Sequence, residues 1–465
     1  MSTLAIDIND AELVIADQTG VLASEPGYAA LSDDVVVAGA EAYAQVRLKP
    51  RQTSNRYWDD LSLEPGSAGI DAADSSAELA FAQLNSLWKR FRGTHTDVVL
   101  VVPGHYTREQ LGLLLGLAQE CEMPVRAMID AGVAASAHPY PGHQLIYVDA
   151  GLHRVSATLL EQGDDVAAES EQALNGVGLA SLIDLWAKRV AEIFVLQTRF
   201  DPFHSADSEQ LVYDRLPEWL TTLQDQGHAE FRLPHHSEEH CVEVKRDQLL
   251  GVADGFYRAV VQLISQCRTA GASLVVQLSH RLLPLPGVVS ELMRLDDAQI
   301  APLDSGAAAL GALGSLDEIA PSGGQVKLLR RLPWRGEAIH LDSGKRKDAE
   351  AVPQASKPAL PEATHVVYRG VAYAIDGSPL IIGREALDGR HTIVLDESQS
   401  AVSRSHCEVV RRDGMLKLMD LSRFGTFVNE KRISGEVALY PADVIRIGSP
   451  GEELQVIALE ESGGS

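Results

Sequence analysis

Short apolar runs alternate with helical patterns through residues 1–318. The run Asp97–Val102 is rich in β-branched residues, a Pro-Gly turn follows it, and Thr107–Gln110 opens a segment whose leucines recur at helical spacing. The same order of strand and helix begins again at Gln144–Asp149 and at Ser273–Leu278, and a helical pattern follows at 286–294. Strands interleaved with helices predict an α/β architecture in which helices cover the sheets.

From residue 365 to about residue 460 the pattern changes to short apolar runs separated by turn residues. The dipeptide Asp413-Gly414 is a strong hairpin signal between two of these runs. This spacing predicts an all-β sandwich. The expected strands are Leu380–Ile382, Thr392–Leu395, His406–Val410, Met415–Leu418, Thr426–Val428, Val444–Ile447 and Leu454–Ala458.

Residues 319–364 separate these two domains and are expected to form a flexible linker. Their Pro-, Ala- and Ser-rich part, Val352–Pro361, can bury little apolar surface. One stretch, Lys327–Arg335, is both basic and apolar. We expect it either to dock on the preceding domain as a last strand or short helix, or to bind a partner or an anionic surface.

Composition and charge narrow the possible classes of protein. With 465 residues, of which 45% are hydrophobic and 23% charged, the chain is typical of a globular protein of about three lobes. A net charge of -25 argues against a protein that binds nucleic acid through its phosphates. No apolar run approaches the roughly 20 residues of a membrane span, and the N-terminus lacks a secretory signal, so we expect a cytoplasmic protein.

Cysteines and histidines give no metal or disulfide pattern. Four widely separated cysteines predict neither a disulfide framework nor a zinc site; they are Cys121, Cys241, Cys267 and Cys407. The histidines of His235–Cys241 lie between two strand-like runs, so we expect a polar hairpin loop there and no metal.

Three motifs in the C-terminal region occur in order: Ile382-Gly-Arg384, Val402-Ser-Arg-Ser-His406 and Asp420–Asn429. Together they resemble a forkhead-associated (FHA) domain over about residues 366–459. The resemblance implies a β-sandwich whose loops at one end bind phosphothreonine. A phosphate with a charge near -2 needs a guanidinium that donates paired hydrogen bonds, with hydroxyl and backbone donors around it.

The resemblance assigns roles to individual residues. Arg384 and Ser403 match the phosphate-contacting arginine and serine, and Arg404 would add charge or contact the peptide backbone. The expected structural positions are Gly383, His406, Gly425 and Asn429, with His406 bracing the loop and Gly425 allowing a tight turn. The sequence departs from the family at Phe424, where most members carry Asn, and Arg423 before it would add a third positive group. This departure leaves the selection of peptide register open, and an FHA sandwich used only as a scaffold stays the alternative.

Segments of the N-terminal region resemble the actin/hexokinase/DnaK-type ATPase superfamily. They are Val101–Leu111, Met128–Ala137 and Ala307–Ala312. The resemblance implies a two-lobed actin/DnaK-like ATPase fold, with a nucleotide between the lobes held by glycine-rich hairpins. Glycine is needed there because backbone N–H groups must approach the phosphates without an intervening Cβ.

The glycines of that nucleotide site are largely replaced in this chain. The first hairpin, Asp7–Asp10, lacks the expected Gly-Thr, and Leu152 and His153 would project into the phosphate space of the second. Leu278-Ser279 replaces the glycine pair beside the adenosine. The residues that remain, Asp7, Asp130, Asp149 and Gly151, form a vestigial nucleotide site, or else Asp7 and Asp149 merely cap turns at strand ends.

We therefore expect a bacterial adaptor with a pseudo-ATPase body, no catalytic residues and no cofactor. Its expected partners are threonine-phosphorylated proteins of a Ser/Thr kinase pathway and a DnaK-like protein on which the body docks. The alternatives are an active, ATP- and Mg-dependent DnaK-like ATPase that its FHA domain targets to phosphorylated partners, and a scaffold that works without phosphorylation.

Overall fold

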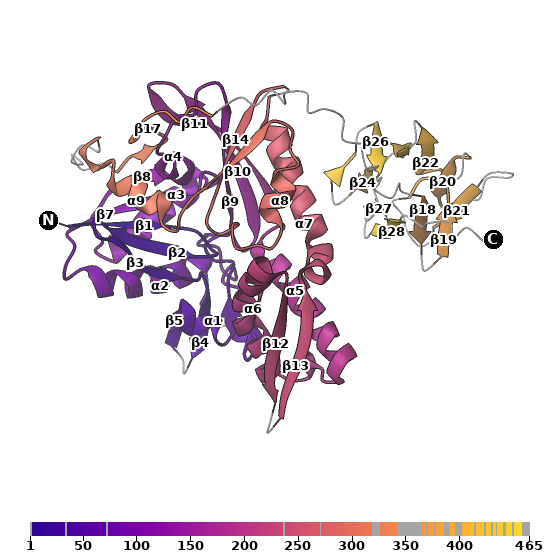
Figure 1. Ribbon diagram of the computed structural model, residues 1–465, viewed down its shortest axis with the longest axis horizontal. Helices are drawn as coiled ribbons and strands as arrows, with labels where there is room; N and C mark the ends of the chain where they lie inside the picture. Colours follow the sequence, from indigo (N-terminus) through magenta and orange to yellow (C-terminus); the bar gives the residue numbers. More distant parts are fainter. Residues whose placement is uncertain are drawn as a thin grey trace. The chain divides into compact units, whose positions relative to one another are not determined.

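The computed structural model divides the chain into two compact units, Met1–Ser343 and Gly344–Ser465 (Figure 1). The residues that the structure describes are 2–32, 35–70, 73–235, 238–269, 271–318, 326–341, 364–368, 371–375, 378–385, 391–395, 402–412, 415–422, 425–428, 431–433, 435–439, 443–448 and 451–457.

The first unit begins with a sheet of mixed direction. Strands β1, β2 and β3 form an antiparallel meander, and β7 and β8 extend the sheet in parallel with β1. β1 and β7 are buried along almost their whole length, as expected of strands covered on both faces. In spatial order the strands are β16 (Leu328–Leu329), β8 (Val125–Asp130), β7 (Asp97–Val102), β1 (Thr3–Asp7), β2 (Leu13–Asp17) and β3 (Gly20–Glu25).

A second sheet repeats this topology. Strands β9, β10 and β11 again form an antiparallel meander, and β14 and β15 again continue in parallel with its first strand. The two halves of the unit therefore share one order of pairing. In spatial order the strands are β15 (Ala298–Pro302), β14 (Leu274–Leu278), β9 (Gln144–Ala150), β10 (Arg154–Gln162), β11 (Asp165–Asn175) and β17 (Arg331–Pro333).

Helices cover both sheets, as the alternating pattern predicts. α2 (Ser76–Phe91) and α3 (Arg108–Glu120) share an apolar core with the first sheet. The predicted start of α3 is confirmed, because the Gln110 N–H donates to Thr107 Oγ1 at 3.2 Å. The helices that share a core with the second sheet are α5 (Leu179–Thr198), α6 (Ala206–Gln226), α7 (Arg246–Cys267) and α8 (Val288–Leu292).

Two short helices fill the space between the sheets. α4 (Ala131–Ala135) and α9 (Ala307–Leu313) lie in a third apolar core to which strands of both sheets contribute. The helices approach so closely that a Cβ at Gly311 of α9 would overlap the carbonyl oxygen of Ala134. The core of the unit is thus continuous from one sheet to the other.

Smaller elements complete the unit. β12 (His228–His235) and β13 (Glu238–Lys245) pair as an antiparallel hairpin, so the expected hairpin is present. Its loop is shorter than expected, because His235 and Glu238–Cys241 belong to the paired strands. The remaining elements are β4 (Ala29–Ser32), β5 (Val35–Ala38), β6 (Thr53–Ser54), α1 (Ala40–Tyr43), η1 (Pro50–Gln52), η2 (Pro202–His204) and η3 (Leu316–Glu318). Within the described residues, no helix is long and apolar enough to cross a membrane, and no His, Cys, Asp and Glu side chains group as metal ligands would.

Residues 326–341 correct the expected extent of the linker. β16 pairs with β8 at the edge of the first sheet, and β17 pairs with β11 at the edge of the second. The Arg335 guanidinium donates to the carbonyl oxygens of Ala134 (2.6 Å) and Ser136 (3.1 Å) at the end of α4. Of the two expectations for Lys327–Arg335, the structure therefore has the docked strand, and we call residues 326–341 the strap. The rest of the expected linker lies largely outside the described residues.

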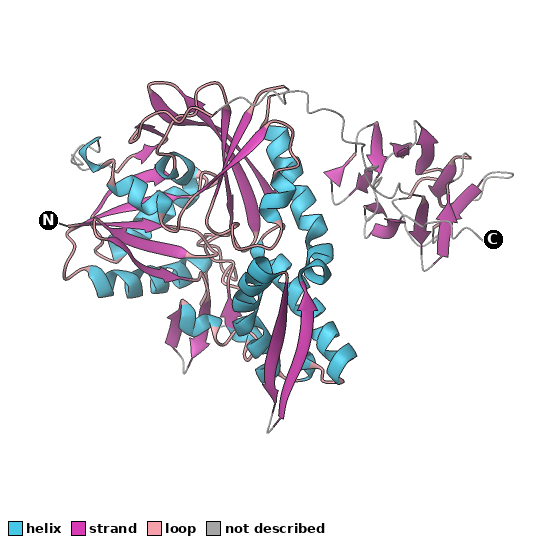
Figure 2. Ribbon diagram, in the orientation of Figure 1, coloured by secondary structure: helices cyan, strands magenta, loops and turns pink. Residues whose placement is uncertain are grey.

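The second unit is a β-sandwich, as predicted. Every regular element among its described residues is a strand (Figure 2). Both of its sheets contribute to one apolar core, which includes Ile382, Val409 and Ile445. One sheet is β19 (Val371–Ala374), β18 (His365–Tyr368), β28 (Gly451–Ile457), β27 (Val444–Gly448), β24 (Thr426–Val428) and β25 (Lys431–Arg432); the other is β21 (His391–Val394), β20 (Leu380–Gly383), β22 (Cys407–Arg412), β23 (Met415–Asp420) and β26 (Glu436–Leu439).

Candidate functional site

Two loops meet at the end of strand β20 in the second unit. The Arg384 N–H donates to the Ser403 carbonyl at 3.2 Å, and the His406 N–H donates to the Ile382 carbonyl at 2.8 Å. The chain needs glycine at position 383, because a Cβ there would overlap the carbonyl oxygen of Arg404. Backbone hydrogen bonds thus place the Gly-Arg motif directly beside the Ser-Arg-Ser-His motif.

His406 ties a third loop to this pair. Its side chain is fully buried, its Nδ1 accepts from the Ser403 N–H at 3.1 Å, and its Nε2 lies 3.1 Å from the Gly425 carbonyl. These contacts require a neutral ring with the proton on Nε2, and burial lowers the pKa of His406 accordingly. Gly425 has φ 94°, a left-handed conformation that favours glycine. This is the arrangement that the expected bracing role requires.

The cationic side chains of these loops are exposed. Within the described part of the chain, the Arg384 guanidinium has no hydrogen-bond or ion-pair partner, and Ser403 is partly buried on the neighbouring loop. The Arg404 side chain, 73% exposed, forms an ion pair with Glu385 at 3.2 Å. Three of the predicted positions, Arg423, Phe424 and Asn429, lie outside the described residues. An exposed guanidinium beside a hydroxyl is the donor set that an anion such as phosphate needs.

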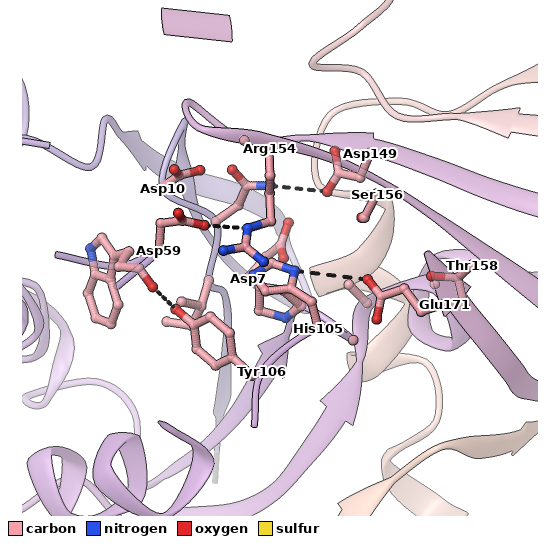
Figure 3. A pocket seen from close by; sticks show the side chains of 18 of the residues that line it. Asp7, Asp10, Asp59, His105, Tyr106, Asp149, Arg154, Ser156, Thr158 and Glu171 are labelled. Atoms are coloured by element: carbon pink, nitrogen blue, oxygen red, sulfur yellow. Dashed lines mark hydrogen bonds and ion pairs between the residues drawn. The ribbon is translucent and has the colours of Figure 1, made fainter. Parts of the chain in front are cut away.

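The first unit brings its two predicted hairpins together. The Asn9 side chain donates to Asp149 at 3.1 Å, and the Leu152 N–H donates to Asp10 Oδ1 at 2.8 Å. A Cβ at Gly151 would overlap the Asp10 carboxylate, so glycine is needed for this close approach. Figure 3 shows Asp10 and Asp149 on the wall of the pocket that remains between the hairpins.

An arginine that the sequence analysis did not single out lies between the two strand-end aspartates. Arg281 follows β14, and its guanidinium is 2.8 Å from the Asp7 carboxylate and 3.1 Å from that of Asp149. It also donates to the Glu12 carbonyl at 2.9 Å. All three charged side chains are buried. Burial opposes the ionisation of Asp149, but the charge of Arg281 outweighs it and holds the pKa of Asp149 below its ordinary value. For Asp7 the effect of burial is larger, and its pKa is raised.

The side chains of Leu152 and His153 do not lie where the family resemblance implies. Leu152 does not project into an open phosphate space but packs in a small core with Tyr28 and Ala30. The Nε2 of His153 lies 3.1 Å from Asn55 Oδ1, so its ring is held by a neighbouring loop. Asp130 accepts from the Val133 N–H at 3.2 Å as the N-cap of α4, which is a structural role.

The pocket between the hairpins is small and acidic. Its volume is about 30 Å³, whereas ligand pockets usually measure roughly 300–1,000 Å³. Burial raises the pKa of Asp10 to about 7, and burial together with the charge of Asp130 raises the pKa of Glu171 to about 8. Burial also lowers the pKa of His105 to about 4. This volume is enough for water molecules and is far below that of a usual ligand pocket.

A search of curated proteins found no match for this chain. A comparison with protein families matched residues 380–448 to the FHA domain. That span contains the Gly383-Arg384 and Ser403–His406 motifs together with Gly425, which the structure joins at one end of the sandwich. The second unit of this protein therefore contains an FHA domain.

Proposed function

We propose that this protein is an adaptor that captures threonine-phosphorylated proteins through its FHA domain. The observation that carries the proposal is the exposed Arg384 guanidinium, which has no ion-pair partner in the described residues and lies beside Ser403 on loops braced by His406. The FHA match supports a phosphothreonine-dependent role, because FHA domains recognise that group. The expected partners are substrates of a Ser/Thr kinase pathway.

The proposed contacts follow from charge and geometry. A phosphothreonine side chain carries roughly -1.5 to -2 charges at pH 7 and three acceptor oxygens. Arg384 donates to these oxygens, Ser403 adds a hydroxyl donor, and Arg404 adds positive charge from the same loop.

For the first unit we propose a DnaK/actin-like body that does not hydrolyse ATP. The repeated sheet topology and the pair of facing hairpins support the family resemblance. Mg-ATP does not fit the residues present, because the Arg281 guanidinium occupies the space between Asp7 and Asp149 where a divalent cation would be bound. Binding of Mg-ATP at micromolar concentration would contradict this part and favour a targeted ATPase. Docking on a DnaK-like protein remains part of the proposal.

The test of the adaptor function compares the full-length chain with Arg384→Ala. Fluorescence anisotropy would measure binding to a degenerate peptide library with a central phosphothreonine and to the same library with threonine. We expect a loss of at least about tenfold in affinity, because a charge-assisted hydrogen bond contributes roughly 1.5–3 kcal/mol.

The matched control is Arg412→Ala, which removes an exposed arginine at the opposite end of β22 and should bind as the wild type does. If Arg384→Ala binds the phosphothreonine library as tightly as the wild type does, Arg384 does not contact the phosphate and the proposed site is wrong. Equal binding of both libraries by the wild type would favour a scaffold that works without phosphorylation.

A further inference from the structure

A carboxylate lies within the proposed phosphate site. Glu385 directly follows Arg384, and its N–H donates to the Arg404 carbonyl at 3.4 Å. Its side chain is 51% exposed, and its carboxylate lies 3.2 Å from Nε of Arg404. Of the two arginines that would meet a phosphate, one is therefore already paired with an internal anion.

The ion pair between Glu385 and Arg404 has two opposite interpretations. Glu385 could position Arg404 for the ligand, or it could compete with the ligand for the same guanidinium. Positioning needs a guanidinium that is held firmly, yet Arg404 is 73% exposed and its ion pair joins a single nitrogen to a single carboxylate oxygen. Exposed pairs of this kind are weak, because solvent screens them and both side chains lose rotamer freedom.

We propose that Glu385 is an internal competitor that occupies Arg404 until a phosphate displaces it, and that it thereby sets the affinity of the site. The inference rests on the proposed function, because the ligand is the same phosphothreonine. The dianion displaces Glu385 because it carries more charge than a single carboxylate. Arg384 needs no such displacement by a partner in the described residues, since it has no ion-pair partner there.

The two readings predict opposite signs for one substitution. If Glu385 competes, Glu385→Gln raises the affinity for a phosphothreonine peptide; if it positions Arg404, the same change lowers it. The expected gain is about 1.4- to fivefold at low salt, which corresponds to the roughly 0.2–1 kcal/mol of an exposed ion pair. The gain should shrink at 0.5 M salt, where the screening length falls to a few ångströms.

The experiment uses the full-length chain and the phosphothreonine library of the adaptor test. Four proteins are compared with the wild type: Glu385→Gln, Arg404→Gln, the double variant, and Glu436→Gln as control. Glu436 pairs with Arg412 and Lys417, so its removal changes the net charge of the unit equally without releasing Arg404. Thermal unfolding of each variant would show that the sandwich remains folded.

The double variant separates competition from general repulsion. We expect Glu385→Gln to increase the affinity of the wild type but not that of Arg404→Gln, and Glu436→Gln to leave it unchanged. A loss of affinity, no change, or an equal gain in both backgrounds would overturn the proposal while the adaptor function stands. Failure of the wild type to prefer the phosphorylated library would overturn the adaptor function and this inference with it.

Discussion

Replacing Arg281 with alanine should destabilise the first unit strongly. The guanidinium lies 2.8 Å from Asp7 and 3.1 Å from Asp149, and all three side chains are buried. Without it, two carboxylates remain buried with no cation between them, a situation that destabilises proteins by roughly 3–5 kcal/mol. For a unit of this size the midpoint of thermal unfolding should fall by roughly 4–7 °C.

The loss of stability caused by Arg281→Ala should become smaller as the pH falls. In the wild type, Arg281 holds the pKa of Asp149 below its ordinary value, so this carboxylate contributes stability that is present above its unfolded pKa and is lost as pH falls. In Arg281→Ala, burial without a cation raises the pKa of Asp7 and Asp149, and their protonation relieves the repulsion. The difference in midpoint between the two proteins should therefore narrow between pH 7 and pH 4.

Differential scanning calorimetry of the full-length chain at several pH values would measure this. Arg294→Ala is the matched control, because it removes an exposed arginine paired with Glu291 and should change the midpoint by little. If Arg281 takes the place of a cation, millimolar MgCl₂ should stabilise Arg281→Ala and leave the wild type unchanged. A midpoint within about 2 °C of the wild type at pH 7, or a loss that is equally large at pH 4, would refute the reasoning.

Two further substitutions test buried titratable groups. Glu171→Gln should raise the midpoint of thermal unfolding of the first unit by several degrees at pH 8 and have little effect near pH 4. The reason is that burial raises the pKa of Glu171 to about 8, whereas the unfolded side chain ionises above about 4.5. Calorimetry at both pH values checks this, and an equal effect at both would contradict it. His406→Ala should lower the midpoint of the second unit and weaken phosphopeptide binding, whereas His391→Ala, at an exposed position, should do neither. Because burial lowers the pKa of His406, the wild-type unit should also lose stability as pH falls below about 6.5, and a circular dichroism melt that does not change between pH 7 and pH 5 would contradict this.

Local signals in the sequence were sufficient for the main elements of the fold. The run Asp97–Val102 is the strand β7, and the Thr107 cap begins α3 where the pattern places it. The docked strand was one of two expectations for Lys327–Arg335, but the positions of β16 and β17 could not be predicted, because these strands have two and three residues, too few to show a period. Their pairing depends on the free edges of β8 and β11, far away along the chain, and no local pattern contains that information.

The candidate sites show the same difference between residues in local motifs and residues whose partners are distant in the sequence. Arg384, Ser403 and His406 could be found because they belong to short motifs, and the backbone hydrogen bonds that join those motifs follow from the strand pairing. Arg281 could not be found in this way, since Asp7 and Asp149 lie 274 and 132 residues from it in the sequence. The sequence offered one signal for Arg281, namely a charged residue just after the buried strand β14. That signal does not indicate which residues the arginine pairs with.

The contrast between Arg281 and Arg384 explains why the two units would differ in function. Arg281 is buried and its charge is neutralised by carboxylates of the chain itself, so an anionic ligand would gain little by approaching it. Arg384 is exposed and has no ion-pair partner in the described residues, so its charge is available to a phosphate. In a chain with a net charge of -25, binding of anions to most of the surface is opposed by repulsion. Under the proposed function, capture of a phosphorylated partner is confined to the places where cations are exposed and loops hold them together, and the end of the FHA sandwich meets both conditions.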